Sequence, residues 1–129
     1  MHKLIVFIFT GAWIGLSEFV RNELLFKSYW VEHYQKMGIE FPSAMINNVF
    51  WGIWSFLLSG ITLFLSKKLK TIESALVLWT MAFLMMWIVI GNLGVLPGKL
   101  LFFAFPLSAL EVLVALIICK KFPDFSKNI

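Results

Sequence analysis

Two glutamates stand inside long apolar stretches of the sequence, where a carboxyl group is costly. Glu18 lies three residues before Arg21, and Glu111 lies well inside the last apolar stretch. A bare carboxylate at the centre of a bilayer costs at least about 2.5–3.5 kcal/mol, so it must be protonated, paired or in contact with water. Ionisable residues within a membrane are also candidates for carrying protons or binding solutes. We therefore expect Glu111 to be a protonatable centre, with the Glu18–Arg21 pair at the mouth of its site.

Four apolar stretches must position these groups. They cover about residues 4–25, 44–66, 72–95 and 100–119. A helix of about 20 residues crosses the roughly 30 Å of hydrocarbon in a bilayer, so each stretch is long enough to span it. The chain is 60% hydrophobic and only 14% charged, against about 25% charged in soluble domains. The sequence therefore predicts one all-α membrane domain over residues 1–129, an antiparallel four-helix transmembrane bundle with a short interfacial helix after the first span.

The lysines and arginines are divided unequally between the two ends of these spans. Seven of the eleven fall at one end, and they are Lys3, Lys67, Lys68, Lys70, Lys120, Lys121 and Lys127. The others, at the opposite end, are Arg21, Lys27, Lys36 and Lys99. Because cytoplasmic loops carry the excess of positive charge, we expect a multi-pass cell-membrane protein with both termini in the cytoplasm. The net charge of +4 then reflects topology, and we expect a lipid bilayer rather than nucleic acid as the partner.

Small and polar residues recur at helical spacing in the first two spans. In the first span Gly11, Gly15, Glu18 and Asn22 are four, three and four residues apart, so they share one face of a helix. The second span has a similar stripe that includes Gly52, Ser55 and Ser59. Small residues let membrane helices approach closely, so we expect helix packing along both stripes, including contacts within a homo-oligomer. A hydrated pathway along the second stripe is the alternative interpretation.

Polar residues also collect toward the outer ends of the spans. At 1.5 Å per residue, Glu18 lies about 9 Å and Glu111 about 17 Å from the outer edge. We expect an outward-facing polar pocket, closed below by Glu111, that binds or transports a small solute or a proton. Its expected residues are Glu18, Arg21, Asn22, Asn47, Asn48, Asn92, Ser108 and Glu111.

The segment between the first two spans has an aromatic face. Six residues recur at three- and four-residue spacing, and they are Phe26, Tyr29, Trp30, His33, Tyr34 and Met37. Glu32 and Lys36 are spaced for an exposed ion pair, and Gly38 would end the helix. Such a face favours the headgroup region, which predicts an interfacial anchor. A lid over the outward-facing pocket is the other interpretation.

Motifs for metal binding, phosphate binding and nucleophilic catalysis are absent from the sequence. Cys119 is the single cysteine, which excludes a disulfide within the chain. We predict no metal site, no cofactor and no catalytic residue. Two other function classes remain open. The chain is a structural or assembly subunit of a membrane complex if its polar stripes only pack. It is a lipid-directed enzyme if Glu18 and Glu111 act as acid and base.

Two short segments carry resemblances to known families. The glutamate in the first span, with the segment from Trp13 to Glu18, resembles the small multidrug resistance transporters. That resemblance implies four spans and the exchange of protons for cationic drugs, although the segment at residues 26–43 is longer than in that family. The segment from Leu25 to Gly38 is similar to the end of the first span in some small, uncharacterised four-span bacterial proteins. The second resemblance implies a fold and no activity.

Overall fold

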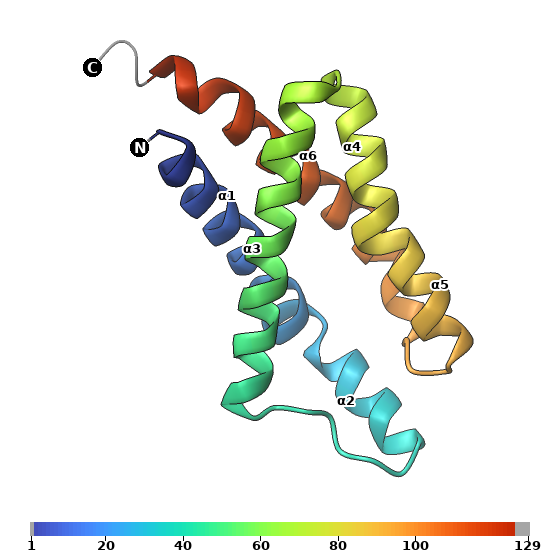
Figure 1. The fold of residues 1–129 in the computed structure, drawn as a ribbon. Coiled ribbons are helices and arrows are strands. Elements are labelled where there is room, and N and C mark those ends of the chain that lie inside the picture. The colour runs from blue at the N-terminus through green and yellow to red at the C-terminus, as the bar shows by residue number, and fades with distance from the viewer. Residues whose placement is uncertain (1, 126–129) are drawn as a thin grey trace.

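Four long apolar helices form a bundle in the computed structural model, which describes residues 2–125 (Figure 1). The first span consists of α1 (His2–Phe19) and η1 (Val20–Leu25), and the second is α3 (Met45–Lys68), with the short helix α2 (Lys27–Lys36) between them. The elements of the last two spans are α4 (Thr71–Trp79), η2 (Thr80–Leu84), α5 (Met85–Asn92), η3 (Gly98–Leu100) and α6 (Leu101–Phe125). Each span is long and apolar enough to cross a membrane, so the predicted fold class is confirmed.

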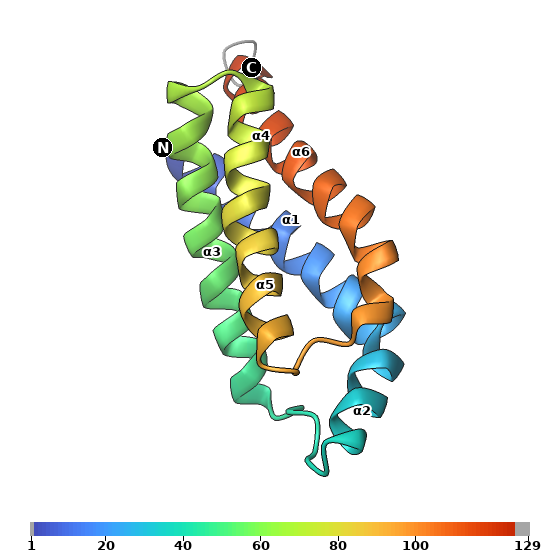
Figure 2. The same ribbon diagram turned by 90° about the vertical axis from the view of Figure 1, so that its right-hand side faces the viewer.

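The connections lie at two opposite ends of the bundle. The start of α1, the turn from α3 to α4 and the end of α6 lie at one end (Figures 1 and 2). The short helix α2 and the turn from α5 to α6 lie at the other, which we call the α2 end (Figures 1 and 2). Consecutive spans therefore run antiparallel. Glycines with φ of +75° shape both connections at the α2 end, since Gly38 follows α2 and Gly94 follows α5.

Two of the spans contain a π-helical segment, which the hydrophobic pattern does not predict. The segment Val20–Leu25 ends the first span, and the N–H of Phe26 donates to the carbonyl of Arg21 over 2.9 Å. The segment Thr80–Leu84 joins α4 to α5 within the third span. Single turns of π-helix widen the backbone locally and often occur at functional sites. In this chain the first of them carries Arg21.

Helices α1 and α3 pack closely through the small residues of the first two spans. A methyl group added at Gly11 would overlap the Phe56 ring, and one added at Gly15 would lie 3.6 Å from Ser55 Oγ. Ser59 Oγ donates to the carbonyl oxygen of Phe7 over 2.7 Å. Gly11, Gly15 and Ser59 are therefore occupied within one chain, whereas a methyl group added at Gly52 would meet no described atom within 4 Å. A homo-oligomer stays a prediction.

We expect Gly11→Ala to destabilise the bundle because the added methyl group pushes the Phe56 ring out of place. Overpacking of this kind costs about 1–3 kcal/mol. The matched control is Gly52→Ala on α3, where the added methyl group meets no atom of the described residues within 4 Å. The measurement is the free energy of unfolding in mixed detergent micelles. A loss of stability in both variants, or in neither, would contradict this account of the α1–α3 contact.

Candidate functional site

Arg21 lies between two glutamates in the interior of the bundle. Its Nη1 donates to Glu111 Oε2 over 2.8 Å, and its Nη2 donates to Glu18 Oε1. The exposed fractions are 4% for Glu18, 6% for Arg21 and 2% for Glu111. We call these three residues the charged cluster. One buried guanidinium therefore holds two buried carboxyl groups that are ninety-three residues apart in the chain.

The antiparallel arrangement of α1 and α6 explains how these side chains meet. Helical side chains lean toward the N-terminus of their own helix. Arg21 on the first span therefore leans away from the α2 end, whereas Glu111 on α6 leans toward it. Trp13 Nε1 also donates to the backbone carbonyl of Glu111 over 3.0 Å and ties the two helices together. The expected mouth and floor of the pocket thus form one cluster instead of two separate layers.

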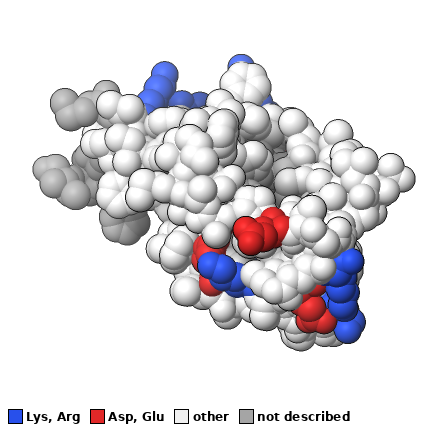
Figure 3. Space-filling model, turned by 90° about the horizontal axis from the view of Figure 1, so that it is seen from below, with Lys and Arg blue, Asp and Glu red and all other residues white. Residues whose placement is uncertain are grey.

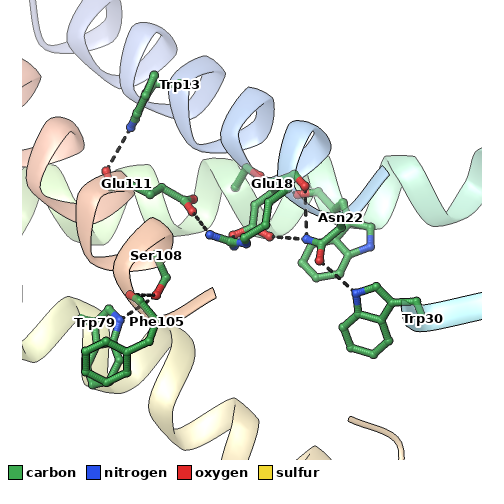
Figure 4. A network of polar contacts seen from close by, with 11 residues as sticks. Trp13, Glu18, Asn22, Trp30, Trp79, Phe105, Ser108 and Glu111 are labelled. Carbon is green, nitrogen blue, oxygen red and sulfur yellow. Dashed lines mark hydrogen bonds and ion pairs between the residues drawn. The ribbon is translucent and has the colours of Figure 1, made fainter. Parts of the chain in front are cut away.

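Neighbouring side chains extend the cluster toward the α2 end. Asn22 Nδ2 donates to Glu18 Oε2 over 3.0 Å, and Asn22 Oδ1 accepts a hydrogen bond from Trp30 Nε1 over 3.2 Å (Figure 4). The Arg21 guanidinium carbon lies 5.1 Å from the centre of the Phe83 ring, within the range of a cation–π contact. The first span, α2 and η2 therefore all contribute to holding the cluster.

The charges of the cluster do not cancel. Two ionised carboxylates and one guanidinium leave one negative charge, and one proton would neutralise it. Glu111 Oε1 is buried and has no hydrogen-bond partner among the described residues. Both carboxyl groups contact the same guanidinium, so a proton on either of them would neutralise the cluster. The cluster thus has both an uncompensated charge and an oxygen able to take a proton.

A cavity of about 290 Å³, which we call the outer cavity, reaches from the charged cluster to the α2 end of the bundle. Polar residues in its wall include Glu18, Arg21, Asn22, Asn47 and Asn48. Its aromatic residues are Trp30, Tyr34, Phe41, Trp51, Phe83 and Trp87. The cavity therefore has aromatic walls, with polar groups that include two members of the charged cluster.

Helix α2 covers this outer cavity. Trp30 stacks on Phe41 with ring centres 6.1 Å apart, and Tyr34 meets the same ring edge-on at 5.3 Å. His33 Nε2 lies 2.6 Å from the carbonyl oxygen of Gly94, which accepts a hydrogen bond from the ring. The aromatic side chains of α2 that line the cavity thus face protein, as a lid would, and α2 is tied to the turn after α5.

The exposed face of α2 carries ion pairs. Lys27 pairs with Glu23 and Lys36 with Glu32, each with a nitrogen–oxygen distance of 3.0 Å, so the predicted pair of Glu32 is present. The hydrogen bond from Lys36 holds the pKa of the Glu32 carboxyl below its ordinary value. Acidic and basic side chains accordingly lie beside each other when this end is viewed directly (Figure 3).

Two of the expected site residues lie away from the cluster. Ser108 is buried, but it accepts from Trp79 Nε1 and donates to the carbonyl of Phe105, both over 2.9 Å (Figure 4). Asn92 is exposed at the end of α5 and does not line the outer cavity. Asn47 and Asn48 lie in the cavity wall, while Glu18, Arg21, Asn22 and Glu111 are linked directly or through one another.

Several site residues escape the sequence analysis because they are aromatic. Trp13, Phe83 and Trp87 look like ordinary apolar residues of a span, and no spacing relates them to a particular glutamate. Trp30 and Tyr34 are predicted in part, since they belong to the aromatic face after the first span.

Comparisons with protein-family models, curated proteins and solved structures find no match for this chain.

Replacing Arg21 with methionine should be strongly destabilising because it leaves two carboxyl groups buried without their cation. Breaking a buried charge pair in this way costs about 3–5 kcal/mol. The control is Lys27→Met, which removes one partner of a pair that is partly exposed and worth about 1 kcal/mol or less. The measurement is again the free energy of unfolding in mixed micelles. Similar losses in the two variants would show that the cluster is solvated.

Proposed function

We propose that this four-span membrane protein binds or transports a small solute or a proton, with the charged cluster as its site. The observation that carries the proposal is the sharing of one buried guanidinium by two buried carboxyl groups. Such a group of charges is neutral with one added proton and negative without it. Gain and loss of a proton, or of a solute with a donor group, would therefore change the charge of the bundle interior.

The energetics of burial support this proposal over a purely structural role. Taking charges out of water costs several kcal/mol per ion, and well-packed apolar residues often stabilise a fold as well or better. A structural ion pair also works best when every lone pair is satisfied, whereas Glu111 Oε1 has no partner among the described residues. The outer cavity adds a route, because its wall includes both Glu18 and Arg21.

Carbodiimide labelling in lipid bilayers across a range of pH tests whether the cluster titrates. An apolar carbodiimide reacts with a protonated carboxyl group, so we expect modification of Glu111 at neutral pH that fades as the pH rises. Mass spectrometry locates the modified residue. Glu40 is exposed and serves as the internal control. If Glu111 is unmodified at every pH, the cluster is sealed into the packing and the structural-subunit hypothesis takes its place.

A flux measurement extends the same test. In liposomes with a potassium diffusion potential and a trapped pH-sensitive dye, we expect proton movement above that of protein-free liposomes. Glu111→Gln should lower it to that background, whereas Glu40→Gln should leave it unchanged. Labelling of Glu111 without proton flux would point to solute binding rather than to proton transport.

We also propose that the end with the two termini faces the cytoplasm. Among the described residues, that end carries Lys3, Lys67, Lys68, Lys70, Lys120 and Lys121 against two acidic residues, Glu73 and Asp124. The lysines at the α2 end are matched by Glu23, Glu32 and Glu40. An excess of positive charge favours the cytoplasmic side.

Cysteine labelling tests this orientation. In a Cys119→Ala background, we expect a membrane-impermeant maleimide added to intact cells to label Ser43→Cys at the α2 end. Lys70→Cys, in the turn between α3 and α4, should be labelled only after the membrane is opened. The reverse pattern would invert the topology, and with it the side from which the outer cavity is entered.

A further inference from the structure

A second cavity opens on the side of the bundle, between the first span and α6. Its volume is about 240 Å³, and Arg21 lines both this cavity and the outer cavity. The residues in its wall are Trp13, Leu16, Ser17, Val20, Arg21, Leu25, Leu107, Leu110 and Glu111. We call this cavity the lateral groove. It is apolar apart from Ser17 and the two members of the charged cluster.

Two residues of the groove wall each carry a buried polar atom that has no partner among the described residues. Glu111 Oε1 and Ser17 Oγ are buried and lack a hydrogen-bond partner within residues 2–125. Other buried hydroxyl groups of the spans are satisfied, as Ser55 and Thr62 show by donating to the carbonyls four residues back over 2.8 Å. Buried polar atoms without a hydrogen bond are costly, so a bound group that forms hydrogen bonds with them is favoured.

The rim of the groove faces the bilayer. Leu16 is 60% exposed and Leu110 is 54% exposed, and Val20 and Leu25 are exposed beside them. In a chain that spans a membrane, apolar side chains at such positions contact the acyl chains of lipids. A molecule that enters the groove therefore comes from within the membrane and brings an apolar body.

We propose that the lateral groove binds a neutral, membrane-soluble alcohol, with its hydroxyl group against Glu111 and its hydrocarbon portion along Leu16, Leu107 and Leu110. The inference rests on the proposed function and names the class of solute. A hydroxyl group donates to a carboxylate oxygen and accepts from a serine hydroxyl, so it suits both unpartnered atoms. An anion would meet the uncompensated negative charge of the cluster, and a cation that enters from the hydrocarbon would first have to lose its hydration. A neutral head group is therefore favoured over either ion.

Binding there would act on the cluster directly. A donor that occupies Glu111 Oε1 takes the place of a proton at that atom, while Oε2 keeps its hydrogen bond to Arg21. Because Arg21 also lines the outer cavity, the alcohol and any solute in that cavity would contact the same guanidinium. The cluster would thus separate a solute site within the membrane from one that opens at the α2 end.

Photolabelling with two matched probes tests this inference. The protein in phosphatidylcholine nanodiscs is irradiated with hexadecanol carrying a diazirine near the hydroxyl group, or with its methyl ether, which has no donor. A hydrogen bond to a charged acceptor is worth roughly a tenfold difference in binding. We therefore expect the alcohol to label residues of the groove about ten times more strongly than the ether. Mass spectrometry assigns the labelled residues.

Variants of α6 make the test specific to the groove. Leu110→Trp fills it and should abolish the preference for the alcohol. Leu113→Trp is the matched control, because Leu113 is exposed on the same helix and does not line the groove. Ser17→Ala removes one of the two polar partners and should reduce the preference in part.

Equal labelling by the two probes would overturn the inference, because any acyl chain would then fill the groove. An equal effect of the two tryptophan variants would overturn it as well. Carbodiimide labelling of the same samples separates the two proposals. If Glu111 titrates while the alcohol has no preference, this inference fails and the proposed function stands. If the alcohol is preferred and Glu111 never reacts, the groove binds a lipid alcohol and the proton chemistry fails.

Discussion

The bundle depends on how one guanidinium is balanced inside a membrane. Hydrocarbon does not solvate charge, so Arg21 must be paired, and it is paired on its own helix with Glu18 and across the bundle with Glu111. The second contact fixes the depth of α6 against the first span. The hydrogen bond from Trp13 to the backbone of Glu111 supports the same register. A slip of either helix by one turn would leave charges without partners, which makes this arrangement strongly preferred.

Other features of the chain surround that pairing. The close contact of α1 and α3 at Gly11 and Gly15 turns the stripe with Glu18 away from lipid. The π-helical segment that follows α1 carries Arg21, and α2 places the Trp30 indole against Asn22, which in turn bonds Glu18. The aromatic layer thus covers the cluster at the α2 end. The lateral groove, which Arg21 and Glu111 line, brings the cluster close to lipid.

Periodicity in the sequence predicts much of the inward face of three spans, since Glu18, Ser55, Ser59, Ser108 and Glu111 are buried, although Asn48 at the start of α3 is exposed. The spacing of Glu18 and Arg21 predicts a pair along one helix, and that pair is present. Periodicity does not say which helix a face will meet. Glu111 and Ser108 share a stripe on α6, yet Glu111 reaches Arg21 while Ser108 bonds Trp79. The rise of 1.5 Å per residue gives the depth of the backbone and ignores the length and direction of the side chains. It therefore placed Glu18 and Glu111 at different depths, although both contact Arg21.

A buried network that served only to pack helices would be expected to satisfy its own atoms. The donors and acceptors around Glu18 do so, through Arg21 and Asn22. Glu111 differs, because one oxygen is bound by Arg21 and the other is left without a partner among the described residues, in the wall of a groove that opens toward lipid. In a low-dielectric interior such an oxygen is costly unless a proton or a ligand completes it. The incompleteness of the cluster, rather than its strength, is therefore the feature that favours a functional role.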